Sequence, residues 1–229
     1  MVVSMRPQAT DDIAPFGVPP LDLSPAALAA KRLAVYGGSF DPPHRGHLWV
    51  AEQAREAFGL DHVVFVPARI PPHKLERSLA PDGDRLALLA LLFGDRAWVS
   101  AWPGELRRPG PSYSVDTLQT FRAALAEDTE LFMILGSDNL PGLPKWHRAE
   151  ELLGLAQPIV ILRSETALAR EHLGGLAADL AEKIVAGFLE VEPFDSSASA
   201  IRLALAEGRD PGPAFPMMLR EYVRLRGLY

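Results

Sequence analysis

Short runs of hydrophobic residues alternate along the chain with longer segments in which hydrophobic residues return every three or four positions. The short runs have the length and composition of strands that are buried on both faces. The longer segments have the period of amphipathic helices. We predict strands at residues 33–36, 62–66, 97–100, 131–135, 158–162 and 188–191. We predict helices from near His44 to Gly59, at 84–93 and at 114–125.

This alternation of strands and helices predicts an α/β fold with a doubly wound parallel sheet. In such a sheet, ligands bind beyond the carboxyl ends of the strands, near the point where the strand order reverses. We therefore expect the loop at Gly37, the segment after Val66 and the segment after Leu135 to line one cleft.

The beginning of the chain has a different pattern. Prolines stand at positions 7, 15, 19, 20 and 25, and the hydrophobic residues show little periodicity. We predict a mobile N-terminal extension at 1–31, with a short helical turn near 26–32, and one domain at 32–229. A targeting peptide is the alternative, but the acidic residues of this segment argue against a transit sequence.

The candidate chemistry lies in residues 33–50, LAVYGGSFDPPHRGHLWV. Gly37 and Gly38 follow a strand, and glycines let the backbone approach a ligand closely. His44 and His47 are three residues apart at a helix start, where they share one face beside unpaired backbone N–H groups. A polar cap in an ordinary strand-loop-helix unit is the simpler alternative. So many special residues within so short a segment favour a phosphate site.

Amino-acid composition excludes several classes of protein and several kinds of site. A hydrophobic content of 48% is enough for a normal core, and the absence of cysteine excludes disulfides, thiolate metal sites and a cysteine nucleophile. The net charge of -6 disfavours a sequence-independent nucleic-acid binder. The longest apolar run, residues 86–93, is too short to span a bilayer. We expect a cytoplasmic protein without nucleic-acid or membrane partners, with a local positive pocket drawn from Arg45, Lys74, Lys145 and Arg202.

Residues 37–48, GGSFDPPHRGHL, resemble the GGxFDPxHxGHL motif of the nucleotidyltransferases related to class I aminoacyl-tRNA synthetases. This form of the motif is closest to that of bacterial nicotinate-nucleotide adenylyltransferases. The resemblance implies a Rossmann-like nucleotidyltransferase fold in which His44 and His47 contact the phosphates of ATP and stabilise the transition state. It implies an ATP site made of Gly37, Gly38, Ser39, Phe40, His44, His47, Gly136, Asp138, Ser197, Ser199 and Arg202.

Two further segments resemble the same family. Residues 67–74, PARIPPHK, are similar to its PxxxPPHK segment, which implies that Lys74 lies near substrate phosphate. A stiff surface loop is the alternative. Residues 136–153 are similar to its GxDxLxxLxxW segment, which implies that Trp146 stacks on the pyridine ring of a mononucleotide. Trp146 could equally be a core residue.

Residues 112–118, SYSVDTL, resemble the family's SYTxDTL stretch. The resemblance implies that Tyr113 and Thr117 approach the mononucleotide. Local helix chemistry is the alternative, with Ser114 as the N-cap and Asp116 as an acid in the first turn.

Residues 195–202, DSSASAIR, resemble the SSTxxR motif that closes the ATP site of this superfamily. Ser197, Ser199 and Arg202 take matching positions, whereas Ala198 replaces the second serine. The resemblance implies that the serines donate at a helix N-terminus and that the arginine binds phosphate. A serine-rich cap followed by a surface arginine is the alternative.

The implied reaction joins ATP and nicotinate mononucleotide to give deamido-NAD and pyrophosphate, with His44, His47 and Arg202 as catalytic residues. Magnesium is expected to arrive with ATP, without a protein metal site. Two alternatives stay open. One is a related adenylyl- or cytidylyltransferase acting on phosphopantetheine, FMN or a phosphorylated alcohol, and the other is a non-catalytic nucleotide sensor. The sequence leaves open the oligomeric state and the preference between nicotinate and nicotinamide mononucleotide.

Overall fold

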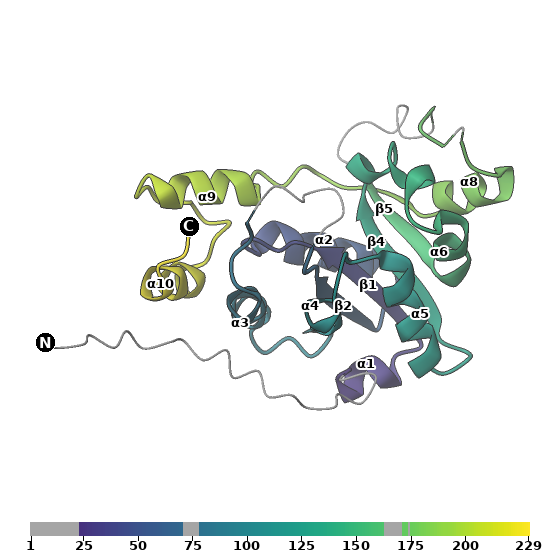
Figure 1. The fold of residues 1–229 in the computed structure, drawn as a ribbon, viewed down its shortest axis with the longest axis horizontal. Helices are drawn as coiled ribbons and strands as arrows, with labels where there is room; N and C mark the ends of the chain where they lie inside the picture. Colours follow the sequence, from purple (N-terminus) through teal and green to yellow (C-terminus); the bar gives the residue numbers. More distant parts are fainter. Residues whose placement is uncertain (1–22, 71–77, 163–170, 174) are drawn as a thin grey trace, which may run out of the picture.

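A computed structural model describes residues 23–70, 78–162, 171–173 and 175–229. They form a six-stranded sheet in which every pairing is parallel (Figure 1). The sheet contains, in the order β3-β2-β1-β4-β5-β6, the strands β1 (Arg32–Gly38), β2 (His62–Pro67), β3 (Val99–Ala101), β4 (Glu130–Gly136), β5 (Gln157–Leu162) and β6 (Phe188–Glu190). The predicted doubly wound parallel sheet is confirmed.

Helices flank the sheet in the order expected for alternating strands and helices (Figure 1). The α-helices are α1 (Pro25–Ala29), α2 (Arg45–Phe58), α3 (Asp82–Phe93), α4 (Gly104–Arg107), α5 (Ser114–Ala124), α6 (Ala149–Leu155), α8 (Ala178–Val185), α9 (Ala198–Ala206) and α10 (Met217–Arg226). Two 3₁₀ turns, η1 (Ser137–Asn139) and η2 (Leu143–Lys145), follow β4. The predicted end of the second helix at Gly59 is confirmed, because this glycine adopts the left-handed conformation of a C-cap.

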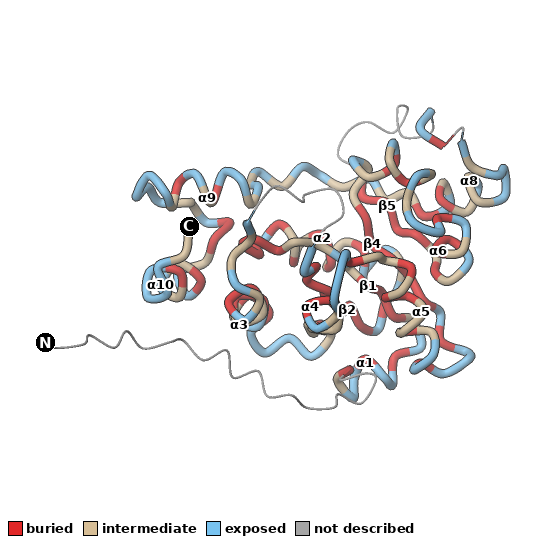
Figure 2. Tube along the Cα trace, viewed as in Figure 1, coloured by how far each residue is buried: buried red, intermediate tan, exposed pale blue. Residues whose placement is uncertain are grey.

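The central strands β1, β2, β4 and β5 are mostly buried, as their continuous hydrophobic runs predict, whereas the edge strands β3 and β6 are largely half-buried or exposed (Figure 2). Along β4, Leu131, Met133 and Leu135 belong to a core layer that also includes residues of α1, α5, α6 and α8. The alternate residues Phe132 and Ile134 belong to the opposite layer, with residues of α2, α3, α9 and α10. The two layers place α2 and α9 on the same side of the sheet.

The strand order reverses between β1 and β4, the two central strands. Tyr36 of β1 is in register with Ile134 of β4, and each strand ends two residues later, at Gly38 and Gly136. The carboxyl ends of both strands therefore lie side by side at the switch point, where doubly wound folds bind ligands. This geometry agrees with the expected meeting of the Gly37 loop and the segment after Leu135.

Some strand ends differ from prediction. The sequence places the first strand at 33–36 and a break at Gly37, but β1 continues through Gly38, because Gly37 and Gly38 pair with Val66 and Pro67 of β2. The third strand begins at Val99 rather than at residue 97. Hydrophobic pattern locates a strand, whereas pairing with its neighbours decides where it ends.

The predicted extension does not stay separate up to residue 31. Ser24 caps α1 by accepting a hydrogen bond from the Ala27 N–H at 3.2 Å. Leu23, Ala27 and Ala30 are buried in the core layer that covers α5. These apolar contacts make residues 23–30 part of the domain, and the helical turn predicted there is α1. Residues 1–22 lie outside the described part of the chain.

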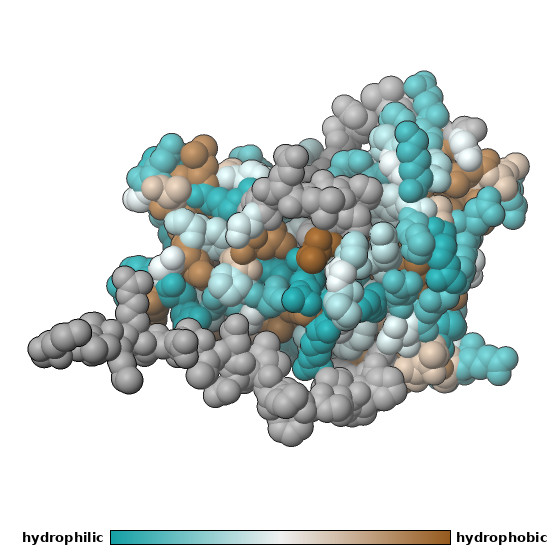
Figure 3. All heavy atoms as spheres, viewed as in Figure 1, coloured by the Kyte–Doolittle hydropathy of each residue, from teal (hydrophilic) through white to brown (hydrophobic). Residues whose placement is uncertain are grey.

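Several hydrophobic side chains are exposed on the side of α9 and α10. Leu203 of α9 and Met217, Met218 and Leu225 of α10 are the most prominent. Figure 3 shows hydrophobic residues in this region next to hydrophilic ones rather than as one continuous face. Across the part of the chain that the structure describes, no helix is both long enough and apolar enough to cross a membrane.

Candidate active site

Two histidines build the start of α2. His44 is the N-cap residue and His47 is the third residue of the helix. The Nδ1 atom of His44 accepts a hydrogen bond from the Gly46 N–H at 3.1 Å, and Nδ1 of His47 accepts one from the His44 N–H at 3.2 Å. The ring centroids are 3.9 Å apart. The pair thus forms a capping box, so the spacing that brings both imidazoles together also stabilises the helix start.

These hydrogen bonds indicate the tautomer of both rings. A ring nitrogen that accepts a hydrogen bond carries no proton, so this geometry assigns the N–H of each imidazole to Nε2. Each histidine therefore has its N–H donor at Nε2, the atom farther from its own backbone. An oxyanion at the start of α2 would meet these two donors together with the positive end of the helix dipole.

Gly46, between the two histidines, is required for this arrangement. A Cβ on Gly46 would lie 2.9 Å from ring atoms of His44 and 2.9 Å from a ring atom of Phe194. Phe194 also packs against Trp49 of α2, with ring centroids 5.9 Å apart. The missing side chain therefore lets the segment just before α9 lie against the start of α2.

The buried ring of Phe40 packs against the ring of His47. The two rings meet edge-on with centroids 5.1 Å apart, and the Phe40 ring also contacts Tyr36 and Phe65. The backbone of Phe40 has a φ of 47°, a left-handed conformation that costs a bulky residue energy unless its surroundings impose it. Because its ring belongs to the core, only the backbone of Phe40 can take the predicted ATP contact.

Arg85 of α3 holds the loop between β1 and α2. This fully buried side chain donates from Nη1 to the carbonyl oxygens of Ser39 and Ala68, each at 2.8 Å, and from Nε to that of Ala80 at 3.1 Å. Asp82 balances its charge. Our sequence reasoning missed Arg85, although its position on the hydrophobic face of α3 is a signal, since arginine is rarely buried without partners.

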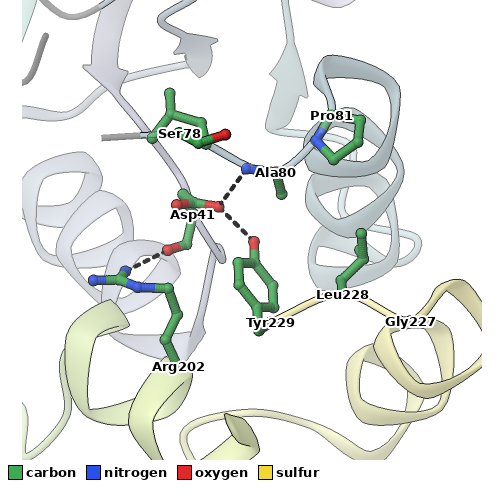
Figure 4. A pocket seen from close by; sticks show the side chains of 9 residues that line it. Asp41, Ser78, Ala80, Pro81, Arg202, Gly227, Leu228 and Tyr229 are labelled. Carbon is green, nitrogen blue, oxygen red and sulfur yellow. Dashed lines mark hydrogen bonds between the residues drawn. The ribbon is translucent and has the colours of Figure 1, made fainter. Parts of the chain in front are cut away.

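Helix α9 brings the segment that resembles the SSTxxR motif to the same loop, where Arg202 lies beside Asp41 (Figure 4). Ser197 is its N-cap and accepts a hydrogen bond from the Ala200 N–H at 3.1 Å. Arg202 donates to Ser199 Oγ at 2.9 Å and to the Asp41 carbonyl oxygen at 2.6 Å. The structure therefore brings Arg202 next to the loop that leads into His44.

A cavity of about 320 Å³ opens beside this contact, between the loop and the two last helices (Figure 4). Asp41, Ala80, Arg202 and Tyr229 are among its lining residues. Asp41 is buried, and its carboxylate accepts hydrogen bonds from the Ala80 N–H and from the Tyr229 hydroxyl. The sequence analysis assigned no role to Asp41 or Tyr229.

Gly136 and Asp138 follow β4 at the neighbouring strand end. A Cβ on Gly136 would lie 2.2 Å from Oδ1 of Asp138, so the carboxylate occupies the space that a side chain would need. Asn139 donates to the Gly136 carbonyl oxygen at 3.1 Å and fixes the turn. Asp138 itself is exposed at the carboxyl end of the sheet, which is compatible with its predicted ligand contact.

Aromatic side chains gather near the start of α5. Tyr113, the N-cap residue of this helix, lies against His147, with ring centroids 4.4 Å apart and an interplanar angle of 32°. Trp146 is half-buried, and both it and Tyr113 pack against the core layer on the α5 side. Trp146 therefore has a packing role, and its indole remains partly exposed. His147 had not been singled out from the sequence.

Thr117 lies deeper than predicted. Its side chain is buried, and its hydroxyl donates to Glu105 Oε1 at 2.5 Å. Burial raises the pKa of Glu105, while hydrogen bonds from Thr117 and Ser112 act in the opposite direction. Thr117 thus binds an internal carboxyl group instead of facing open space. Ser114 is the first residue of α5 and not its predicted N-cap.

Sequence comparison places the chain among known proteins. The cytidylyltransferase-like family model matches residues 35–204. A probable nicotinate-nucleotide adenylyltransferase of Dehalococcoides mccartyi is 32% identical over 203 residues, which cover 88% of this chain and 98% of the relative. One of Gloeobacter violaceus is 37% identical over 202 residues, with 87% and 96% covered. The chain belongs to the nicotinate-nucleotide adenylyltransferase family.

A solved structure of the nicotinic acid mononucleotide adenylyltransferase of Plasmodium falciparum, complexed with NaAD, has the same fold. It is 19% identical in sequence, its TM-score is 0.65, and the match covers 87% of this chain and 97% of that one. The family's motif at the start of α2 thus lies on the fold that the sequence predicts.

Besides Arg202, the predicted positive pocket includes three more cationic side chains, Arg45, Lys74 and Lys145. Lys74 lies outside the described residues, and Arg45 and Lys145 are exposed. Among the residues with described positions, no three histidine or carboxylate side chains group closely enough to hold a metal ion.

Proposed function

We propose that the chain transfers the adenylyl group of ATP to nicotinate mononucleotide and forms deamido-NAD and pyrophosphate in NAD biosynthesis. The observation that carries this proposal is the His44–His47 pair, whose two Nε2–H groups stand at the start of α2 beside the switch point. The names of the relatives support the choice of substrates. Because the reaction consumes ATP, a cytoplasmic location forms part of the proposal.

The chemistry needs alignment rather than an activated nucleophile. The phosphate oxygen of the mononucleotide attacks the α-phosphorus of ATP, and the bond from that phosphorus to the bridging oxygen of the β-phosphate breaks. Pyrophosphate leaves with the electron pair. A phosphate monoester is already anionic at neutral pH, so no general base is required. The enzyme must hold both substrates and stabilise the charge that develops on the transferred group.

His44 and His47 donate hydrogen bonds from Nε2 to phosphate oxygens in this proposal. Because both Nδ1 atoms accept bonds from the helix start, the rings act as fixed donors and do not exchange protons with substrate. The N-terminus of α9, with Ser197, Ser199 and Arg202, completes the phosphate site. The backbone of Gly37, Gly38, Ser39 and Phe40 and the turn at Gly136 and Asp138 border the nucleotide.

We propose that magnesium enters this site as an ion carried by the ATP phosphates. When bound, it neutralises charge on the phosphates. All other stabilisation in the proposal comes from the two histidines, Arg202 and helix N-termini. These groups bind and orient the oxygen atoms around the α-phosphorus.

The mononucleotide is proposed to bind near the start of α5. The partly exposed indole of Trp146 offers a flat apolar surface for the pyridine ring, and the Tyr113–His147 pair lies close by in the same layer. Thr117 positions this region through its bond to Glu105 rather than by touching substrate. Lys74 remains a predicted contact to substrate phosphate.

The decisive experiment is pyrophosphate release by the purified protein with ATP and either nicotinate or nicotinamide mononucleotide, with CTP as the alternative donor. We expect release with ATP and nicotinate mononucleotide, and deamido-NAD as the product by mass spectrometry. ATP binding without release with either mononucleotide would overturn the proposal and favour a nucleotide sensor. Activity only with another phosphorylated acceptor, such as phosphopantetheine, would indicate a different member of the superfamily.

A further inference from the structure

The loop that leads into His44 is tied to the last turn of the chain through one buried carboxylate (Figure 4). Asp41, which is 3% exposed, accepts hydrogen bonds at Oδ1 from the Tyr229 hydroxyl at 2.7 Å and from the Ala80 N–H at 3.1 Å. Its carbonyl oxygen accepts from Arg202 at 2.6 Å. Three segments distant in sequence therefore meet at this single residue.

Tyr229 is a fixed donor in this contact. Burial, and then the hydrogen bond to the Asp41 carboxylate, raise the pKa of Tyr229 far above its usual value, although Arg202 and Arg85 act in the opposite direction. The phenol therefore keeps its proton over the whole working range of pH. Gly227, in the left-handed conformation, ends α10 and turns the chain so that Tyr229 reaches the loop.

The orientation of Asp41 affects the position of His44, because only two residues separate them. Pro42 and Pro43 separate Asp41 from His44, and the proline ring fixes the φ angle at both positions. A rotation of Asp41 would therefore move the N-cap residue of α2. The carbonyl of the same residue also binds Arg202, so such a rotation would change the spacing between α9 and the start of α2.

We propose that Tyr229 is a positioning residue of the ATP site: its hydroxyl holds Asp41 so that the His44–His47 pair and Arg202 face the same phosphates. This proposal rests on the proposed function. Tyr229 acts through Asp41 and does not itself contact the reacting atoms. Its loss should weaken ATP binding without an equal effect on the mononucleotide.

The chain contains a matched control for this contact. Tyr222, on α10, donates its hydroxyl to the buried carboxylate of Asp84 at 2.8 Å. Asp84 also accepts from Arg226, so the hydrogen bonds of this cluster run between α10 and α3. Tyr222→Phe and Tyr229→Phe thus each remove one tyrosine hydroxyl that donates a hydrogen bond to a buried aspartate. Both tyrosines lie close to the end of the chain, but only Tyr229 lies at the proposed ATP site.

The test compares wild type, Tyr229→Phe and Tyr222→Phe in steady-state kinetics, thermal unfolding and calorimetric binding of α,β-methylene-ATP. We expect Tyr229→Phe to raise the KM for ATP and the Kd for the analogue about five- to tenfold, the scale of one ordinary hydrogen bond, because Tyr229 acts on ATP only through Asp41. The KM for the mononucleotide should stay within about twofold. Tyr222→Phe should lower Tm about as much as Tyr229→Phe does. It should leave the KM for ATP and the Kd for the analogue within about twofold of the wild-type values.

An unchanged Kd for the analogue in Tyr229→Phe, or an equal rise in both variants, would overturn the positioning role and leave only a structural one. The binding measurement separates this result from the proposed function. A wild type that binds the analogue but forms no dinucleotide would disprove the function, while the ratio of Kd values would still decide the role of Tyr229. A wild type that neither binds the analogue nor forms the dinucleotide would overturn both proposals.

Discussion

The proposed phosphate end of the site, at His44 and His47, and the proposed mononucleotide end, at Tyr113 and Trp146, are held together by different forces. At the phosphate end, hydrogen bonds within a few residues fix His44 and His47, and buried polar groups hold the loop before them. At the mononucleotide end, Tyr113 and Trp146 come from separate elements and are held by packing against the core. Directional bonds define where an anion must lie, whereas packed rings define a surface. Substitutions at the first end should therefore lower the rate, and those at the second should weaken substrate binding.

The largest effect should come from His47. Removing its Nε2–H donor in His47→Ala should lower kcat by about 10²- to 10³-fold, the usual loss for one transition-state donor. His47→Gln and His47→Asn test separately the two functions of the ring, which are the Nε2–H donor and the Nδ1 acceptor. Glutamine can place an N–H near the position of Nε2, whereas asparagine can replace only the Nδ1 acceptor that caps the helix.

We expect His47→Gln to keep more activity than His47→Asn, and His47→Asn to keep more thermal stability than His47→Ala. Steady-state kinetics and thermal unfolding of the three variants test this order. Near-normal turnover in His47→Ala would remove the histidine from the mechanism. Equal activity in the glutamine and asparagine variants would show that the Nε2 donor is not the group that matters.

A smaller effect is expected at the second phosphate motif. Arg202→Ala removes a charge-assisted contact and should weaken ATP binding or turnover about ten- to a hundredfold. Ala198→Ser restores the family's usual hydroxyl and should be nearly neutral, because Ser197 already caps α9 and Ser199 already contacts Arg202. ATP kinetics of both variants provide the measurement. A large gain from the serine would mean that the natural site is impaired and would favour a nucleotide sensor.

At the mononucleotide end, Trp146→Ala should raise the KM for the mononucleotide about three- to tenfold and spare the KM for ATP. It should also lower Tm, since Trp146 packs against the core layer beside α5. Leu155→Ala serves as a control, because Leu155 packs against the same layer. The control should lower Tm with both KM values unchanged. A matching loss of stability in the two variants without any change in KM would leave Trp146 as a core residue only.

The smallest effect concerns stability and pH at Glu105. Burial raises its pKa in the folded protein, with Asp116 in the same direction and Arg108 and two hydroxyl donors opposing. The folded state therefore binds the proton more tightly than the unfolded state. This contribution to stability is complete below the unfolded pKa and is lost as pH rises through the folded pKa.

Glu105→Gln keeps an oxygen that can accept from Thr117 and has no charge to bury. We expect its Tm, relative to wild type, to increase by a few degrees as pH rises from acidic to neutral, because only wild type loses the proton. Thermal unfolding across that range measures the difference. A difference in Tm that does not depend on pH would contradict the raised pKa and assign the effect to packing alone.

The sequence by itself determined the features that depend on near neighbours. Hydrophobic runs and helical periods were enough to predict the parallel sheet, since burial on both faces leaves a continuous apolar strand. The spacing of His44, Gly46 and His47 was enough to locate the helix start, because capping bonds span only a few residues. The family resemblance then supplied the expected reaction.

Only the tertiary structure decided which distant groups hold that helix start in place. Tyr229 donates a hydrogen bond to Asp41, which is 188 positions earlier in the sequence. Arg85 of α3 donates one to the carbonyl oxygen of Ser39 in the loop between β1 and α2. The position of Arg85 on the hydrophobic face of α3 indicates burial, but the sequence names the partner of neither residue, because each contact depends on where the chain returns after several crossovers. The same reason explains the packing of α1 on the core and the stacking of Tyr113 on His147. Local spacing specifies which chemical groups meet at the helix start, and long-range packing specifies which distant residues hold them there.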